Sequence, residues 1–272
     1  MLKLREWIPI QNLVWDMLSM NPNAIYLLEE SPENINWGIL SSNPAALHIL
    51  ARNQEKIHWE AFCEHQQDLY MIEDHKERQY FKYLSRNPHA IGMLERNRHK
   101  INWYWLSANK AAINMLNNEP DRICWRWLWN NPNAIPMLKE NMDKLDLCML
   151  LSNPGAIAII EENLHRINNE FYWCQLCKNP NAVHIIEQNL DKMSPRCWFW
   201  ICGNPNAIHL VEKNQDKIHW YALSSNPSIF VYDYPKMKEA HQELKEEIIM
   251  AAVHPKKLKR WLELGADIED LF

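Results

Sequence analysis

The sequence is poor in glycine, in net positive charge and in long apolar runs. Only 5 of its 272 residues are glycine, so neither a glycine-rich phosphate loop nor a turn-rich β architecture is expected. The formal net charge is −5, whereas proteins that bind nucleic acid through its phosphates usually carry a basic face. No apolar run approaches the roughly 18 residues of a membrane span. We therefore expect a chain that binds neither nucleic acid nor membranes.

Targeting and catalytic motifs are also missing. The segment from Met1 to Trp7 has no apolar core and no small-residue cleavage site, so it is not expected to be a signal peptide. No G-x-x-x-x-G-K-[ST], G-x-S-x-G, H-E-x-x-H or kinase-like motif occurs. We expect an intracellular protein that is not an enzyme and has no cofactor.

Tryptophan is abundant, at 14 residues, and it recurs at a regular interval. We count about ten copies of a unit of about 22 residues and number them repeats 1 to 10. Two short insertions, near residues 169–172 and 195–197, precede repeats 8 and 9. Position 1 of each repeat, in order, is Trp15, Trp37, Trp59, Phe81, Trp103, Trp125, Leu147, Trp173, Trp198 and Trp220.

Each repeat predicts two short helices. Position 7 is asparagine in every repeat except repeat 3, which has His65, and proline usually follows at position 8. Asparagine followed by proline is typical of a helix N-cap with proline in the first turn. We expect this helix to run to about position 16, where an asparagine at position 17 would end it in a left-handed conformation. A shorter helix covers about positions 1 to 5, and apolar positions 4, 10, 11 and 14 face the core.

Helices this short are not stable alone, so neighbouring repeats must stack. The sequence therefore predicts an all-α fold, an α-solenoid of about ten helix-turn-helix repeats in one continuous domain. Residues 1–14 would form an N-terminal cap, 15–234 the repeats and 235–272 the C-terminal capping helices, one over 236–253 and another over 256–264. A leucine-rich repeat is the less favoured alternative, because the L-x-L alternation is missing and proline directly follows asparagine.

Charged residues follow the repeat as well. Position 20 is usually lysine or arginine and position 19 is usually acidic, which predicts solvated ion-pair rows between repeats. His48, His184 and His209 share position 12, on the outer edge of the second helix, where we expect surface residues.

The cysteines offer a metal hypothesis. Seven scattered cysteines form no disulfide framework and are typical of a reducing setting. Cys174-x-x-Cys177 followed by Cys197 and Cys202 loosely resembles paired zinc ligands. Cys177 and Cys202, however, occupy position 5, which normally holds serine, and this favours a simple need for a small side chain. Metal binding by the four cysteines stays open, and we assign no metal ligand.

Position 3 carries an aromatic stripe in part of the chain. The stripe predicts either packing between neighbouring repeats or a partly exposed ladder that anchors a partner protein, since tryptophan and tyrosine are typical of binding hot spots. The candidate partner-binding residues are Tyr83, Trp105, Trp127 and Trp200.

The unit W-x-x-L-S-x-N-P-x-A-I resembles short repeats in proteins of large nucleocytoplasmic DNA (giant) viruses. The opening at residues 7–10, Trp-Ile-Pro-Ile, and the segment at residues 254–265 are also similar to those proteins. The resemblance implies a viral origin and a place in the host cytoplasm or the virion, and it supplies no catalytic residues. We expect a protein–protein interaction scaffold or adaptor whose partner is a host or viral protein. The alternative is a structural component of the virion or viral factory.

Overall fold

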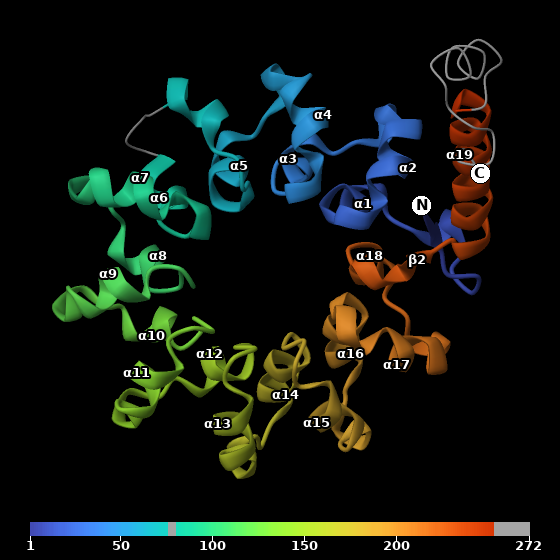
Figure 1. Ribbon diagram of the computed structural model, residues 1–272. Coiled ribbons are helices and arrows are strands. Elements are labelled where there is room, and N and C mark those ends of the chain that lie inside the picture. Colours follow the sequence, from blue (N-terminus) through green and yellow to red (C-terminus); the bar gives the residue numbers. More distant parts are fainter. Residues whose placement is uncertain (76–79, 253–272) are drawn as a thin grey trace, which may run out of the picture. The chain divides into compact units, whose positions relative to one another are not determined.

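A computed structural model gives the structure of residues 1–75 and 80–252 (Figure 1). The chain divides into two compact units, one from Arg5 to Ile229 and one that joins Met1–Leu4 to the segment from Phe230 onward. The first unit contains the repeats. Its described residues are mainly short helices that follow one another in tandem, so the fold is the all-α repeat fold that the sequence predicted.

Each repeat begins with a first helix at or near position 1. These helices are α1 (Trp15–Met20), α3 (Trp37–Leu40), α5 (Trp59–His65), α6 (Phe81–Leu84), α8 (Trp103–Leu106), α10 (Trp125–Leu128), α12 (Leu147–Leu151), α14 (Glu170–Cys177), α16 (Pro195–Gly203) and α18 (Trp220–Ser224). The two insertions lengthen α14 and α16, which have 8 and 9 residues where most others have four or five.

A second α-helix begins at position 11 in eight repeats. These helices are α2 (Ile25–Glu30), α4 (Leu47–Ala51), α7 (Ile91–Arg96), α9 (Ile113–Asn117), α11 (Ile135–Lys139), α13 (Ile157–Glu162), α15 (Val183–Glu187) and α17 (Ile208–Lys213). Repeat 3, whose pattern is eroded, has the 3₁₀ helix η6 (Tyr70–His75) there instead.

Short 3₁₀ turns connect these helices. In five of the eight repeats with proline at position 8, positions 8–10 form a 3₁₀ helix: η2 (Pro22–Ala24), η4 (Pro44–Ala46), η8 (Pro88–Ala90), η14 (Pro205–Ala207) and η16 (Pro227–Ile229). Positions 18–20 form another: η3 (Pro32–Asn34), η5 (Gln54–Lys56), η9 (Arg98–Lys100), η10 (Pro120–Arg122), η11 (Met142–Lys144), η12 (Leu164–Arg166), η13 (Leu190–Lys192) and η15 (Gln215–Lys217).

The expected left-handed asparagine at position 17 is wrong. Asn53 and Asn97 have φ of −137° and −129°, outside the left-handed region. The side-chain amide ends the helix instead, because Asn53 Nδ2 donates to Ile49 O at 2.9 Å and Asn97 Nδ2 donates to Met93 O at 3.0 Å. The last carbonyl groups of a helix have no N–H partner within it, and the asparagine amide supplies a donor for one of them.

Positions 4, 10 and 14 form the core. All ten side chains at position 4, from Leu18 to Leu223, are at most 1% exposed, and so are the alanines at position 10. Burying one leucine contributes roughly 1.5–3 kcal/mol, and the same apolar layer repeats along the unit. The small alanine side chain at position 10 allows neighbouring helices to approach closely, and repeat 10 has the fully buried Ile229 there instead.

An asparagine ladder joins each repeat to the one before it. In the fifth repeat, Asn109 Oδ1 accepts the N–H of Ala111, which is the predicted N-cap. Its Nδ2 also donates to Ser85 O at 3.0 Å and to Asn87 O at 2.9 Å, both in the preceding repeat. One side chain thus caps its own helix and satisfies two carbonyls of its neighbour, which requires both the acceptor and the NH₂ group of an amide.

The ladder has ten members, each with both bonds to the preceding repeat: Asn21, Asn43, Gln66, Asn87, Asn109, Asn131, Asn153, Asn179, Asn204 and Asn226. In repeat 3, the amide of Gln66 takes the place of asparagine, one residue after His65. Its Nε2 donates to Ser41 O and Asn43 O, whereas its Oε1 is buried and caps nothing among the described residues.

The ladder closes on itself. Asn21 of repeat 1 donates to Ser224 O at 3.0 Å and to Asn226 O at 2.9 Å, both in repeat 10. Asn23 Nδ2 adds a bond to Pro227 O. Repeat 10 therefore precedes repeat 1 in space just as repeat 4 precedes repeat 5, and the unit from Arg5 to Ile229 is a closed array of repeats, with the first helices forming its inner row (Figure 1).

Residues 10–14, near the start of the chain, take the place of positions 18–22 of repeat 10. In several repeats, the position-5 serine accepts the N–H of position 22, as Ser41 Oγ does from His58 N. Ser224 Oγ accepts the N–H of Val14 at 2.8 Å. The 3₁₀ helix η1 (Ile10–Asn12) and the buried Leu13 then match positions 18–21. This segment lies within the region 1–14 that we expected to form a cap.

The described residues of the other unit form a small sheet and one long helix. Strand β1 (Leu2–Leu4) pairs antiparallel with β2 (Phe230–Tyr232), with Lys3 opposite Val231. Helix α19 (Tyr234–Ala252) covers most of the helix expected at 236–253. The helix expected at 256–264 lies outside the described residues. In the part of the chain that the structure describes, no helix is long and apolar enough to cross a membrane.

Candidate functional site

Aromatic side chains of adjacent first helices pack together on α8 and α10. The ring centroids of Trp105 and Trp127, both at position 3, are 5.3 Å apart. Tyr104, at position 2, meets both rings edge-on, at 5.7 Å from Trp105 and 5.4 Å from Trp127. The two tryptophans are half-buried, and Tyr104 is 47% exposed. The stripe therefore does pack between repeats, and it also keeps part of its surface open to solvent.

Two cations lie over this group. Lys82 Nζ is 5.4 Å from the ring centroid of Tyr83 and 6.0 Å from that of Trp105. Arg86 Cζ is 5.2 Å from the ring of Trp105, and the guanidinium also pairs with Glu64 at 2.8 Å. Each such cation–π contact contributes roughly 0.5–1 kcal/mol at an exposed site.

We call this set the aromatic patch; it consists of Lys82, Tyr83, Arg86, Tyr104, Trp105 and Trp127. Its three position-3 members were predicted from the sequence. The residues at positions 2 and 6, which lie next to position 3 on the same helix or in the following turn, were not predicted. Comparing those positions between neighbouring repeats could have found them. The patch spans three consecutive repeats.

Trp200, the fourth candidate, lies in a separate aromatic group on α16. Its ring is 38% exposed, and Lys178 Nζ lies 4.0 Å from its centroid. Burial lowers the pKa of Lys178. Phe199 meets Trp200 edge-on at 5.0 Å and stacks on Tyr221 of repeat 10 at 6.4 Å. The four predicted residues thus fall into two groups, and only Tyr83, Trp105 and Trp127 belong to the aromatic patch.

The cations at position 20 have a different role from the one expected. They lie over the position-1 ring of their own repeat, at distances between 3.8 Å for Lys144 over Trp125 and 5.1 Å for Lys192 over Trp173. Four more pairs are Lys56 with Trp37, Lys100 with Phe81, Arg122 with Trp103 and Lys217 with Trp198. These six cations lie over aromatic rings of position 1, so they do not form a free basic stripe.

We expected pairs between neighbouring repeats to involve the cations of position 20. Histidines at position 12 pair with glutamates of the preceding repeat instead. His48 Nε2 is 3.0 Å from Glu29 Oε1 of the preceding repeat, and His184 Nε2 is 3.1 Å from Glu161 Oε1. His209 pairs in the same way with Glu187. All six side chains are roughly half-exposed, in agreement with the expected surface position of the histidines.

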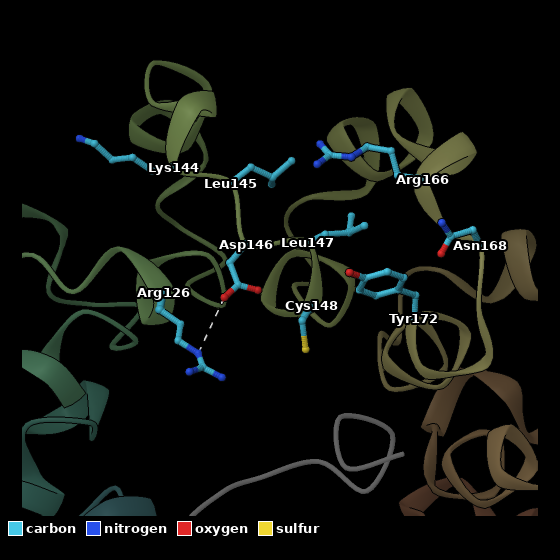
Figure 2. Close-up of a pocket in the computed structure, with 9 residues that line it drawn as sticks. All are labelled: Arg126, Lys144, Leu145, Asp146, Leu147, Cys148, Arg166, Asn168 and Tyr172. Carbon is cyan, nitrogen blue, oxygen red and sulfur yellow. Dashed lines mark ion pairs between the residues drawn. The ribbon is translucent and has the colours of Figure 1, made fainter.

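A polar cavity of about 650 Å³ lies beside α10, α12 and α14 (Figure 2). Its basic side chains already have partners within the chain. Arg126 Nε is 3.8 Å from Asp146 Oδ2, Lys144 lies over a tryptophan ring, and Arg166 donates to Asn163. Figure 2 shows Lys144 pointing away from the other side chains. The cavity therefore gathers no set of uncommitted cations that would define an anion site.

The cysteines do not form a metal centre among the described residues, where no group of three or more potential ligands has suitable geometry. Cys202 Sγ accepts the N–H of His219 at 3.3 Å, so it replaces the position-5 serine as the sequence suggested. Cys174 Sγ and Cys197 Sγ lie 3.2 Å apart on the two lengthened helices.

Comparison of the chain with protein families, with curated proteins and with solved structures finds no match. The contacts and exposure of the aromatic patch are therefore the observations that bear on function.

Proposed function

We propose that the protein is a non-enzymatic binding module that holds a segment of a partner protein on its aromatic patch. The observation that carries the proposal is the contact of Trp105 with Trp127 across two repeats, beside the half-exposed Tyr104. Tryptophan, tyrosine and arginine are the residue types that most often carry binding energy at protein interfaces. Because the rings already hold one another, little conformational entropy is lost when a partner binds.

The charge of the patch indicates the chemistry of the partner. Lys82 is exposed, and the guanidinium of Arg86 forms an ion pair with Glu64 while its side chain stays partly exposed. A partner segment that presents an acidic side chain next to an apolar or aromatic one complements both features, since complementary charge speeds association and fixes register. The resemblance to repeat proteins of giant viruses extends the proposal to a host or viral protein, inside the infected cell or the virion.

The test uses displayed random peptides panned against the purified full chain. We expect enriched peptides to be acidic and aromatic, and Lys82→Glu to weaken their binding about tenfold or more, because one exposed charge pair is lost and one repulsion is added. Lys110→Glu is the matched control, since Lys110 is an exposed lysine outside the patch that undergoes the same change of charge.

A second pair of variants tests the rings. Tyr104→Ser removes a patch residue that is 47% exposed, whereas Tyr221→Ser removes the residue at the same repeat position, 51% exposed, outside the patch. Loss of binding in the first variant alone supports the proposal. Equal binding by both variants, or the absence of any enriched peptide, would contradict it and favour the structural role.

A further inference from the structure

The two insertions in the repeat pattern bring two thiols together. The extra turn of α16 carries Cys197, and α14 carries Cys174 at position 2 of its repeat. Their sulfur atoms are 3.2 Å apart, and both residues are buried as free cysteines. A sulfur–sulfur bond is about 2.05 Å long, so the two side chains need to move together by only a little more than 1 Å.

Hydrogen bonds favour a thiolate at one member of the pair. Hydrogen bonding with the side chains of Cys177, Cys174 and Ser194 lowers the pKa of Cys197 to about 6 despite its burial. Burial raises the pKa of Cys174 to about 12. Cys197 is therefore the group that can accept the proton of Cys174 when the latter reacts.

Cys174 is the member that a solvent-borne reagent can reach. It lines a cavity of about 600 Å³ whose wall also includes Phe171, Arg196 and Trp200. Cys197 does not line this cavity and is 0% exposed. The pair thus places a thiol that lines the cavity beside a second sulfur, which can take the proton of the first and then resolve its oxidised product.

We propose that Cys174 and Cys197 are an oxidation site at which hydrogen peroxide converts the two thiols into a disulfide between repeats 8 and 9. The sulfur of Cys174 attacks one oxygen of the peroxide while its proton passes to the Cys197 thiolate, which gives a sulfenic acid on Cys174 and a hydroxide ion. The sulfur of Cys197 then displaces the sulfenic hydroxyl, which leaves as water with the proton of Cys197. Two electrons move from the sulfurs to the peroxide.

The experiment treats the reduced full chain with a small excess of hydrogen peroxide and then alkylates it under denaturing conditions. We expect the number of titratable thiols to fall from seven to five, the mass of the chain before alkylation to fall by two hydrogens, and peptide fragmentation to place the bond between Cys174 and Cys197. The disulfide should also raise the temperature of unfolding, because it restricts the conformational freedom of the unfolded chain between Cys174 and Cys197.

Two variants serve as controls. Cys197→Ser should abolish the disulfide and leave Cys174 reduced, because the variant lacks both the group that takes the proton of Cys174 and the second sulfur. Cys63→Ser, which removes a buried cysteine of another first helix, should leave the disulfide unchanged. Seven free thiols after treatment, or a bond between Cys197 and Cys177 instead, would overturn the proposal.

Discussion

Replacing Asn109 with aspartate separates the two roles of the asparagine ladder. Asparagine and aspartate are equally good N-caps, so a side chain that only caps its helix would tolerate the change. In the structure, the amide of Asn109 also donates to the carbonyls of Ser85 and Asn87, and it is 1% exposed. The aspartate would keep the acceptor that Ala111 needs, but it would turn an oxygen with partial or full negative charge toward two carbonyl oxygens.

The expected cost follows from these contacts. The carbonyl of Asn87 keeps a second donor, the N–H of Ala90, whereas the carbonyl of Ser85 loses its amide partner. One buried carbonyl without a partner costs about 1–3 kcal/mol, and the buried repulsion adds to it. We therefore expect Asn109→Asp to lower the free energy of unfolding by roughly 2–4 kcal/mol at neutral pH.

Urea unfolding, followed by circular dichroism and tryptophan fluorescence, measures this difference. The control is Asn133→Asp, the same chemical change at a side chain whose one bond to the preceding repeat, to Lys110 O, is exposed to solvent. We expect the control to cost less than about 1 kcal/mol. If the two variants lose equal stability, the ladder does not join the repeats and the reasoning fails.

Three further substitutions test local packing by thermal unfolding. Gly155→Ala should destabilise by about 1–3 kcal/mol, because a Cβ would clash with the backbone carbonyl of Pro132. Gly92→Ala should instead stabilise its helix by about 0.5–1 kcal/mol, since a Cβ there meets nothing nearer than 3.7 Å. Trp129→Phe should cost about 1–3 kcal/mol, because the indole N–H donates to Lys144 O at 2.7 Å. A stabilising Gly155→Ala or a neutral Trp129→Phe would contradict these contacts.

The helices and the core could be predicted from sequence because both depend on neighbours within one repeat. Asparagine followed by proline specifies a local N-cap, and Leu40 and Ala46 mark buried faces by their spacing alone. The left-handed conformation expected at Asn53 was wrong because a side-chain bond to Ile49 O, four residues earlier, satisfies the same end of the helix. A residue type alone does not distinguish these two ways of ending a helix.

Closure of the array could not be predicted, because its contacts join residues more than 200 positions apart. Asn21 looks like any other position-7 asparagine in the sequence, and only the structure places Ser224 and Asn226 beside it. A retrospective signal does exist: Leu13 and Val14 match positions 21 and 22, directly before repeat 1. Those two positions complete repeat 10, whose first helix lies near the other end of the chain.

The candidate site was predictable only in part. Position 3 drew attention to Trp105 and Trp127, and the structure brings these two together. Trp200 shares the position but lies three repeats beyond Trp127, in the separate group with Phe199 and Lys178. Arg86 and Lys82 were missed because their contacts with Trp105 join two neighbouring repeats, and the spacing within one repeat does not show which rings lie there.

The closed array is the central claim, and a distance measurement between labels on the second helices tests it most directly. Glu30 and Lys213 occupy position 16 of repeats 1 and 9, and Arg96 and Glu140 occupy position 16 of repeats 4 and 6. All four side chains are exposed, and each can be replaced by a genetically encoded keto amino acid that carries a spin label. If the array is closed, both pairs are two repeats apart and double electron–electron resonance should give similar distances. A much longer distance for the pair at 30 and 213 would show an open stack of repeats and contradict the account.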